Sequence, residues 1–233
     1  MKRIGIMGGT FNPIHNGHLM IAEQAREQFA LVKVLFMPSG IPYMKDQREI
    51  LPVDIRCEMT TLAITNDPYF ELSTLEAEDA MQGKNTYTYA TLQKLRQKDP
   101  EADYYFILGA DSLYAIENWK YPALIFQNCT ILTAARAAEM PADIRLPHSM
   151  AHRPSEQSES DAVPAESRNR LRQQVQHLRE KYDASVELLE FAGIEVSSTQ
   201  IRENVRRGKS ICGLVPEAVE AYIRKKHFYE KDS

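Results

Sequence analysis

Short apolar segments, rich in β-branched and aromatic residues and bounded by turn-forming residues, recur along the chain. Such segments are typical of β-strands. Six of them occur, at residues 3–7, 32–37, 69–74, 102–108, 129–134 and 185–191. Their apolar character is nearly continuous instead of alternating, which is expected for strands that are covered on both faces of a parallel sheet.

Helical patterns lie between these segments. Apolar residues spaced three and four apart predict a helix over 17–30, a second around 55–63 and a third over 88–98, which ends before a proline. Because strands and helices alternate, the sequence predicts an α/β fold, a Rossmann-like doubly wound parallel sheet flanked by helices. We expect a single domain over residues 1–233 with a small helical part at its carboxyl end.

The stretch from about 137 to 185 departs from this pattern. It starts with scattered prolines and polar residues, and it then becomes a charged helix around 168–182 that carries a narrow apolar stripe. We interpret the stretch as a surface loop and a peripheral helix, inserted before the last strand. A separate small domain is the alternative interpretation.

The composition narrows the class of protein. With 43% hydrophobic residues, 26% charged residues and a formal net charge of -4, the chain resembles an ordinary globular protein. A strongly basic field for duplex nucleic acid is missing, so a small nucleotide is the expected ligand and a nucleic acid polymer is not.

The sequence also bears on the compartment. The apolar stretch after Lys2 and Arg3 is broken by glycine after too few residues for a signal peptide, and no segment is long enough to span a bilayer. The three cysteines lie far apart and form no CxxC pair, so neither a disulfide framework nor a zinc site is supported. We therefore expect a cytoplasmic protein without a membrane partner.

The run GGTFNPIHNGH follows the first predicted strand, at residues 8–18. Ligands of open parallel sheets bind beyond the carboxyl ends of the strands. Gly8 and Gly9 allow the backbone N–H groups to approach a phosphate, and the helix that follows points its positive end at the same place. His15 and His18 are three residues apart, so both can face one ligand. The run predicts a phosphate site; the alternative is a tight turn with surface or capping histidines.

Two common phosphate motifs do not fit the sequence. The glycines near the amino end do not form the dinucleotide fingerprint GxGxxG. The segment Gly208-Lys209-Ser210 matches the end of a Walker motif, but Glu203 stands where its first glycine is required. Both motifs are therefore rejected.

GGTFNPIHNGH resembles the signature of the HxGH nucleotidylyltransferase superfamily. The full set of motifs is similar to that of the bacterial nicotinate-nucleotide adenylyltransferase family, whose members make nicotinate adenine dinucleotide during NAD biosynthesis. The other motifs are PSGIPYMK, the RxxM pattern at Arg56 and Met59, NTYTYATLQKL, LGADSLYAIENWKYPALI and IEVSSTQIRENVRRGKS. The likeness spans nearly the whole chain except 137–185.

The resemblance implies site residues for two substrates, ATP and nicotinate mononucleotide. The implied catalytic residues are His15 and His18. The residues implied for ATP are Gly8, Gly9, Thr10, Phe11, His15, His18, Ser197, Ser198, Thr199 and Arg202. The residues implied for the mononucleotide are Lys45, Thr86, Tyr87, Asp111, Trp119 and Arg136. No metal ligands are implied.

By the same resemblance, each mononucleotide residue has a role. Trp119 would stack on the electron-poor pyridinium ring, and Asp111 would bind ribose hydroxyls. Thr86 and the backbone near Tyr87 would donate to the pyridine carboxylate. Lys45 would meet the mononucleotide phosphate.

Arg136 is expected to meet the same phosphate as Lys45. Many members of the family follow this arginine with Pro-Gly, whereas Ala137 and Ala138 follow it in this chain. The path of the loop after Arg136 therefore stays open. Arg56 is expected to organise the preceding loop.

Simpler interpretations exist for two of these motifs. Thr86 or Thr88 could cap the helix that begins there, and Ser197 with Gln200 has the spacing of a capping box. Hydroxyls and N–H groups at a helix start also form an anion site, so capping and binding can coexist.

The implied reaction is attack of the mononucleotide phosphate on the α-phosphorus of ATP, with pyrophosphate as leaving group. The nucleophile is already an anion, so catalysis is mostly positioning and charge neutralisation. Mg²⁺ is expected with ATP, held largely by phosphate oxygens and water.

Other functions stay open at this point. A pantetheine-phosphate adenylyltransferase or a cytidylyltransferase shares the HxGH site, and a non-catalytic nucleotide-binding module is a different class of function. Class I aminoacyl-tRNA synthetases use a similar motif, but this chain is short, acidic and without an anticodon-binding segment. The preference for nicotinate over nicotinamide mononucleotide and the oligomeric state, a homo-oligomer included, also stay open.

Overall fold

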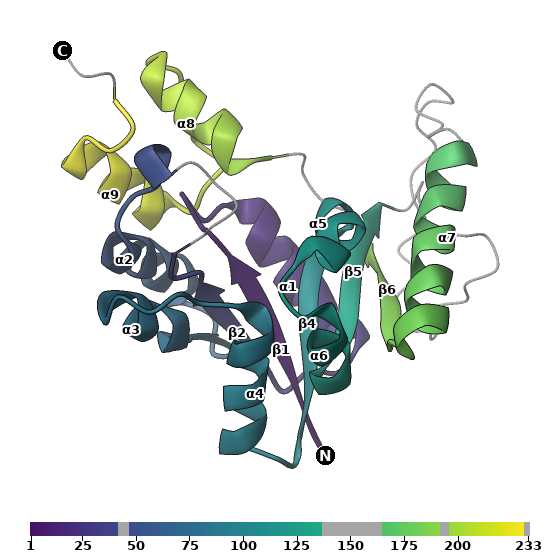
Figure 1. Cartoon of the computed structure of the whole chain (residues 1–233). Coiled ribbons are helices and arrows are strands. Elements are labelled where there is room, and N and C mark those ends of the chain that lie inside the picture. The colour runs from purple at the N-terminus through teal and green to yellow at the C-terminus, as the bar shows by residue number, and fades with distance from the viewer. Residues whose placement is uncertain (42–46, 137–164, 192–195, 231–233) are drawn as a thin grey trace.

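The computed structural model describes residues 1–41, 47–136, 165–191 and 196–230. Its centre is a sheet of parallel strands in the order β3-β2-β1-β4-β5-β6 (Figure 1). The strands are β1 Lys2–Gly9, β2 Lys33–Pro38, β3 Phe70–Leu72, β4 Ala102–Gly109, β5 Thr130–Arg136 and β6 Val186–Phe191. All six predicted strands are therefore confirmed, although β3 is shorter than its apolar segment.

Helices connect these strands and cover both faces of the sheet. They are α1 Asn16–Gln28, α2 Val53–Ile64, α3 Leu75–Met81, α4 Thr88–Lys98, α5 Ala110–Ala115, α6 Pro122–Asn128, α7 Ala165–Tyr182, α8 Ser198–Arg206 and α9 Glu217–Lys226. Two short 3-10 helices, η1 Gln47–Glu49 and η2 Ile116–Asn118, lie in the connections. The predicted helix over 88–98 matches α4 at both ends.

The core is divided into two layers by the sheet. On one face, Ile6, Phe106 and Ile131 pack with apolar residues of α4, α5, α6 and α7. On the other face, Ile107 and Leu132 pack with apolar residues of α1, α2, α8 and α9. Figure 1 accordingly shows α4 and α6 in front of the sheet and α1 behind it. Neighbouring residues of one strand thus enter opposite layers, which confirms the doubly wound Rossmann-like fold.

The strand order reverses direction at β1. The chain moves outward from β1 through β2 to β3, and it then returns to form β4 on the other side of β1. At such a reversal the connections leave in opposite directions, so a crevice opens beyond the carboxyl ends of the two strands. The turn after β1 and the start of α5 after β4 border this crevice.

Several helices did not stand out in the sequence. The segments of α3, α5 and α6 are only six or seven residues long, so their periodicity is too brief to separate helix from loop. The helix α9 is the observed form of the predicted helical part at the carboxyl end.

The stretch from 137 to 185 is described in part. Residues 137–164 lie outside the described residues, and the predicted charged helix is present as α7, which begins at Ala165. Its apolar stripe, Leu171, Val175 and Leu178, is buried in the same layer as Val186 of β6. Among the described residues, no helix combines the length and the apolarity needed to cross a membrane.

Candidate active site

The turn after β1 is built around a buried phenylalanine. Phe11 adopts a positive φ of 48° and is 1% exposed. A Cβ atom at Gly9 would lie 2.7 Å from its ring, so only glycine allows the chain to fold back this tightly. The Phe11 ring contacts the His18 ring edge-on, with centroids 5.0 Å apart. The Phe11 side chain therefore packs against the His18 ring. Because that side chain is buried, a ligand at Phe11 would contact its backbone atoms.

The two histidines lie side by side at the start of α1. His15 is the N-cap residue, and its ring stacks on the ring of His18 with centroids 3.6 Å apart. The backbone N–H of His15 donates to Nδ1 of His18 at 3.2 Å. A neutral imidazole that accepts at Nδ1 carries its proton on Nε2, so the ring N–H donor of His18 is at Nε2.

The charge of His15 is set by its surroundings. The side chain is buried, and this desolvation lowers the pKa of His15 from its ordinary value to about 4. His15 is consequently neutral near pH 7. An anion bound beside the ring would favour the protonated form and raise this pKa.

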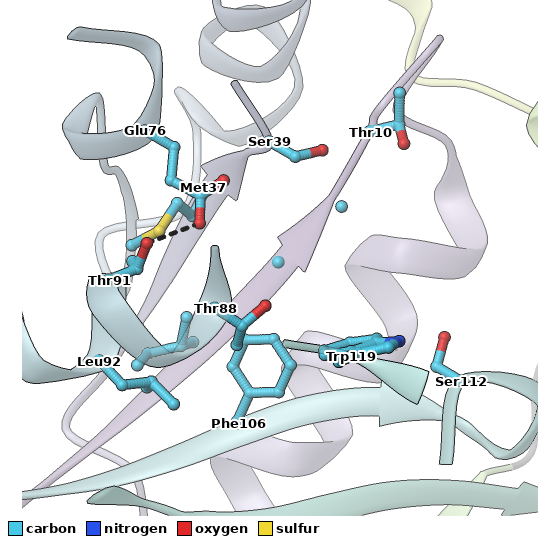
Figure 2. A pocket seen from close by; sticks show the side chains of 13 residues that line it. Thr10, Met37, Ser39, Glu76, Thr88, Thr91, Leu92, Phe106, Ser112 and Trp119 are labelled. Atoms are coloured by element: carbon cyan, nitrogen blue, oxygen red, sulfur yellow. Dashed lines mark hydrogen bonds between the residues drawn. The ribbon is translucent and has the colours of Figure 1, made fainter. Parts of the chain in front are cut away.

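A cavity of about 250 Å³ opens beside the turn, at the carboxyl ends of β1, β2 and β4 (Figure 2). Its wall combines apolar side chains with hydroxyl groups and one carboxylate. The lining residues are Ile6, Gly8, Gly9, Thr10, Met37, Ser39, Glu76, Thr88, Thr91, Leu92, Phe106, Ser112 and Trp119. Three residues expected for ATP and one expected for the mononucleotide thus border one space.

Trp119 forms an aromatic side of this cavity. Its indole packs edge-on against Phe106, with ring centroids 6.2 Å apart and an interplanar angle of 89°. In Figure 2 the indole lies across the cavity from Glu76 and Thr91. Trp119, the residue after η2, is thus half-buried and contributes an aromatic ring to the cavity wall.

The other residues expected for the mononucleotide have different surroundings. Asp111 lies exposed in the first turn of α5, and it is the next residue, Ser112, that lines the cavity. Arg136 ends β5, but its side chain is not among those described. Lys45 lies outside the described residues.

The residue that caps α4 is not one of the two threonines that the capping alternative names. The N-cap residue is Tyr87, not a threonine. Thr86 is 7% exposed, and its side chain hydrogen-bonds to the carboxylate of Glu76. The ring of Tyr87 lies 4.2 Å from Nζ of Lys120, measured from the ring centroid. The threonine is thus held inside the protein while the tyrosine faces a cation.

The start of α8 packs on the turn after β1. Ser197 is its N-cap and accepts from the backbone N–H of Gln200 at 3.2 Å, as the capping interpretation predicts. Ser198 Oγ donates to the carbonyl of Pro13 at 2.8 Å. Arg202 donates to the carbonyl of Asn12 at 3.0 Å. Residues about 190 positions apart in the sequence therefore meet here. The amino ends of α1 and α8 both add positive electrostatic potential at this place.

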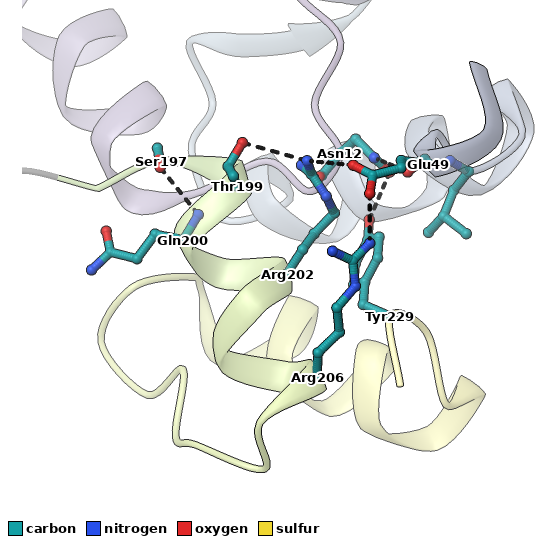
Figure 3. A network of polar contacts seen from close by, with 9 residues as sticks. Asn12, Glu49, Ser197, Thr199, Gln200, Arg202, Arg206 and Tyr229 are labelled. Carbon is teal, nitrogen blue, oxygen red and sulfur yellow. Dashed lines mark hydrogen bonds and ion pairs between the residues drawn. The ribbon is translucent and has the colours of Figure 1, made fainter. Parts of the chain in front are cut away.

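Asn12 is the centre of a polar network that the sequence did not reveal (Figure 3). Its amide is 3% exposed, donates to the carbonyl of Glu49 at 2.8 Å, and accepts from the Leu51 N–H at 3.2 Å and the Tyr229 hydroxyl at 2.9 Å. Every one of these contacts joins distant segments, so no local spacing could have indicated them.

Glu49 forms ion pairs with two arginines of α8 in this network. Its carboxylate lies 3.5 Å from Arg202 and 3.2 Å from Arg206 (Figure 3). Arg206 is thus held near the turn after β1 by its contact with Glu49. Glu49 is half-exposed, so an entering anion can compete with it for these guanidinium groups.

Arg56 connects the loops that border the cavity. It is 1% exposed, and its guanidinium donates to the carbonyl groups of Leu51 at 2.9 Å, Thr10 at 2.7 Å, Ser39 at 2.7 Å and Gly40 at 2.9 Å. The expectation that Arg56 organises the loop agrees with these contacts.

Comparisons with known proteins extend these observations. Residues 6–204 match the model of a family described as cytidylyltransferase-like. A protein of Lachnoclostridium phytofermentans named "Probable nicotinate-nucleotide adenylyltransferase" is 38% identical over 229 residues, covering 98% of this chain and 100% of its own. A protein of Geotalea uraniireducens with the same name is also 38% identical, over 97% of this chain and 98% of its own.

A solved structure resembles the fold. It is the nicotinic acid mononucleotide adenylyltransferase of Plasmodium falciparum complexed with NaAD, with a TM-score of 0.70, 17% identity and 98% of both chains covered. At this identity, the likeness concerns the arrangement of the elements alone.

Burial of His15 gives a pH-dependent stability. The pKa of His15 is about 4 in the folded protein against an ordinary 6.5, so the unfolded chain binds more protons in this window. Stability is full above about pH 6.5 and falls as the pH drops toward 4, by at most about 3 kcal/mol. Urea unfolding of the parent and of His15→Gln at several pH values measures this, because the other groups titrate in both proteins. A stability difference between the two that stays constant with pH would contradict the assignment.

Proposed function

The chain belongs to the cytidylyltransferase-like family and, within it, to the nicotinate-nucleotide adenylyltransferases, and on this premise we propose that it joins nicotinate mononucleotide to the adenylyl group of ATP. The products are nicotinate adenine dinucleotide and pyrophosphate, and the reaction is a step of NAD biosynthesis. The observation that carries the proposal is the cavity that adjoins both the glycine turn before the two histidines and the ring of Trp119.

The reaction needs alignment more than acid–base chemistry. A phosphate oxygen of the mononucleotide attacks the α-phosphorus of ATP, and the bond to the bridging oxygen breaks, so that its electron pair leaves with pyrophosphate. The attacking oxygen is already anionic, which removes the need for a protein base or a covalent intermediate. The protein must hold two anions in line and offset their charge.

The triphosphate fits the corner between α1 and α8. Gly8 and Gly9 let the backbone approach it, and His18 presents its Nε2–H as a donor. His15 is neutral near pH 7 and would gain a proton more easily beside the phosphates. Arg202 exchanges its contact with Glu49 for phosphate oxygens. These residues, with Thr10, Phe11, Ser197, Ser198 and Thr199, form our proposed ATP site.

The mononucleotide fits the aromatic side of the cavity. Trp119 is available to stack on the pyridinium ring, which is electron-poor and attracted to an aromatic face. The backbone at Thr86 and Tyr87 would receive the carboxylate, because the Thr86 side chain is already bound to Glu76. Asp111, Lys45 and Arg136 remain proposed contacts for ribose and phosphate.

We also propose that Mg²⁺ binds together with ATP, where it would neutralise part of the phosphate charge. In the described part of the chain, no group of three or more His, Cys, Asp or Glu residues could hold a metal ion. Phosphate oxygens and water would accordingly supply most of its ligands.

An acceptor comparison tests the function. The purified protein is given ATP and Mg²⁺ with nicotinate mononucleotide, nicotinamide mononucleotide or phosphopantetheine, and pyrophosphate release is measured. We expect the highest kcat/KM with nicotinate mononucleotide. Preference for phosphopantetheine would refute the substrate, whereas ATP binding by calorimetry without pyrophosphate release for any acceptor would indicate a binding module.

His18→Ala tests the donor at the glycine turn. We expect kcat/KM to fall by about 10² to 10³, the usual cost of losing a donor to developing negative charge. Steady-state kinetics measures the loss, and circular dichroism shows whether the fold persists. His227→Ala is the matched control, since that histidine is exposed at the end of α9 and bonds to Glu230. Activity of His18→Ala within a few-fold of the parent would exclude this role.

Trp119→Ala tests the ring assignment. Loss of the stacking face is expected to raise the KM for nicotinate mononucleotide by about tenfold. The KM for ATP should change little, because the stacking face of the indole is proposed to serve the pyridinium ring and not ATP. Initial rates with each substrate varied in turn measure both constants. A selective rise in the KM for ATP would show that the ring assignment is wrong.

A further inference from the structure

Glu76 is a buried carboxylate in the wall of the cavity. It lies in α3 and is 9% exposed. It accepts from the Thr91 hydroxyl at 2.8 Å (Figure 2). It also accepts from the Gly40 N–H at 3.3 Å, and the Thr86 side chain hydrogen-bonds to it as well. The donors come from α4, from the turn before α4 and from the turn after β2. One carboxylate therefore joins three segments that surround the proposed mononucleotide site.

Burial of this carboxylate is unfavourable by itself. Desolvation raises the pKa of Glu76, and the hydrogen bonds act in the opposite direction. Desolvation likewise lowers the pKa of the buried Arg56, and the charge of Glu76 is one of several that act in the opposite direction. A buried carboxylate and a buried guanidinium thus lie in the same interior region.

Gly40 lies between these two charges. Its N–H donates to Glu76, and its carbonyl accepts from Arg56 at 2.9 Å. A Cβ atom at this position would lie 2.6 Å from the Glu76 carbonyl oxygen and 2.9 Å from Cγ2 of Thr86. The backbone of Gly40 is therefore bound by Glu76 and by Arg56, and a residue with a Cβ atom does not fit there.

An unbroken series of hydrogen bonds joins two parts of the cavity wall. Arg56 also donates to the carbonyl of Thr10 at 2.7 Å, in the turn where we propose that ATP binds. From there the connection runs through Arg56 and Gly40 to Glu76, and from Glu76 to Thr86. Its two ends border the proposed sites of the two substrates. In-line transfer requires that these sites keep a constant separation.

We propose that Glu76 is a positioning residue that sets the mononucleotide-binding wall relative to the ATP-binding turn, acting through Gly40 and Arg56. This inference rests on the proposed function. It names a residue whose sequence context, LEAEDA, looks like an exposed acidic helix. Glu78 shows the contrast, since it lies in the same helix, is exposed, and accepts from the Thr74 hydroxyl on the surface.

The test compares Glu76→Gln with Glu78→Gln as the matched control. The glutamine keeps the shape of Glu76 but removes its charge and replaces one acceptor oxygen by a donor. We expect Glu76→Gln to raise the KM for nicotinate mononucleotide by about tenfold and to lower kcat, while the KM for ATP stays within about twofold. Glu78→Gln should leave these constants at the parent values.

The readout separates positioning from simple destabilisation. A smaller fraction of folded enzyme would lower kcat and leave both KM values unchanged. An unchanged KM for the mononucleotide in folded Glu76→Gln would therefore overturn the inference. If the parent protein itself formed no nicotinate adenine dinucleotide, the proposed function would fail first, and that outcome is recognised before any variant is compared.

Thr91→Val provides a second variant in case Glu76→Gln does not fold. Valine matches the shape of threonine but cannot donate to the carboxylate, and Thr91 is buried. We expect a rise in the KM for the mononucleotide in the same direction, with a folded protein by circular dichroism. A folded Thr91→Val with parental KM values for both substrates would count against the role of Glu76.

Discussion

The buried guanidinium of Arg56 is the interaction on which the site depends most. A charge inside the protein must have its donors satisfied, and Arg56 satisfies them with the carbonyls of Thr10, Ser39, Gly40 and Leu51. These carbonyls belong to the turn after β1, the turn after β2 and the entry to α2. One side chain thereby sets the relative position of the strand ends that border the cavity, and the binding groups inherit that geometry.

Among the described residues, the basic groups beside the glycine turn are neutral or paired with a carboxylate. His15 is neutral, and Arg202 and Arg206 are paired with Glu49. Each of these groups can respond to phosphate, the histidine by taking up a proton and the arginines by exchanging one anionic partner for another. Glu49 thus reduces the repulsion between the two arginines.

The strands could be predicted because they depend on local spacing. Apolar runs of strand length between helical patterns indicated a doubly wound parallel sheet, and the β3-β2-β1-β4-β5-β6 sheet has that form. The glycine turn with His15 and His18 was recognisable for the same reason, since its chemistry lies within eleven consecutive residues. The short helices α3, α5 and α6 escaped prediction because tertiary packing, more than helical periodicity, stabilises them.

The sequence by itself determined the alternation of elements, the phosphate turn and the family resemblance, because all of these depend on residues that are close together in the chain. Only the tertiary structure decided which distant groups satisfy each other. Glu76 meets Gly40 across 36 positions, and Arg202 meets the carbonyl of Asn12 across 190. The physical reason is that a buried polar group takes its partner from whatever segment packs against it, and packing follows the fold as a whole instead of any local pattern.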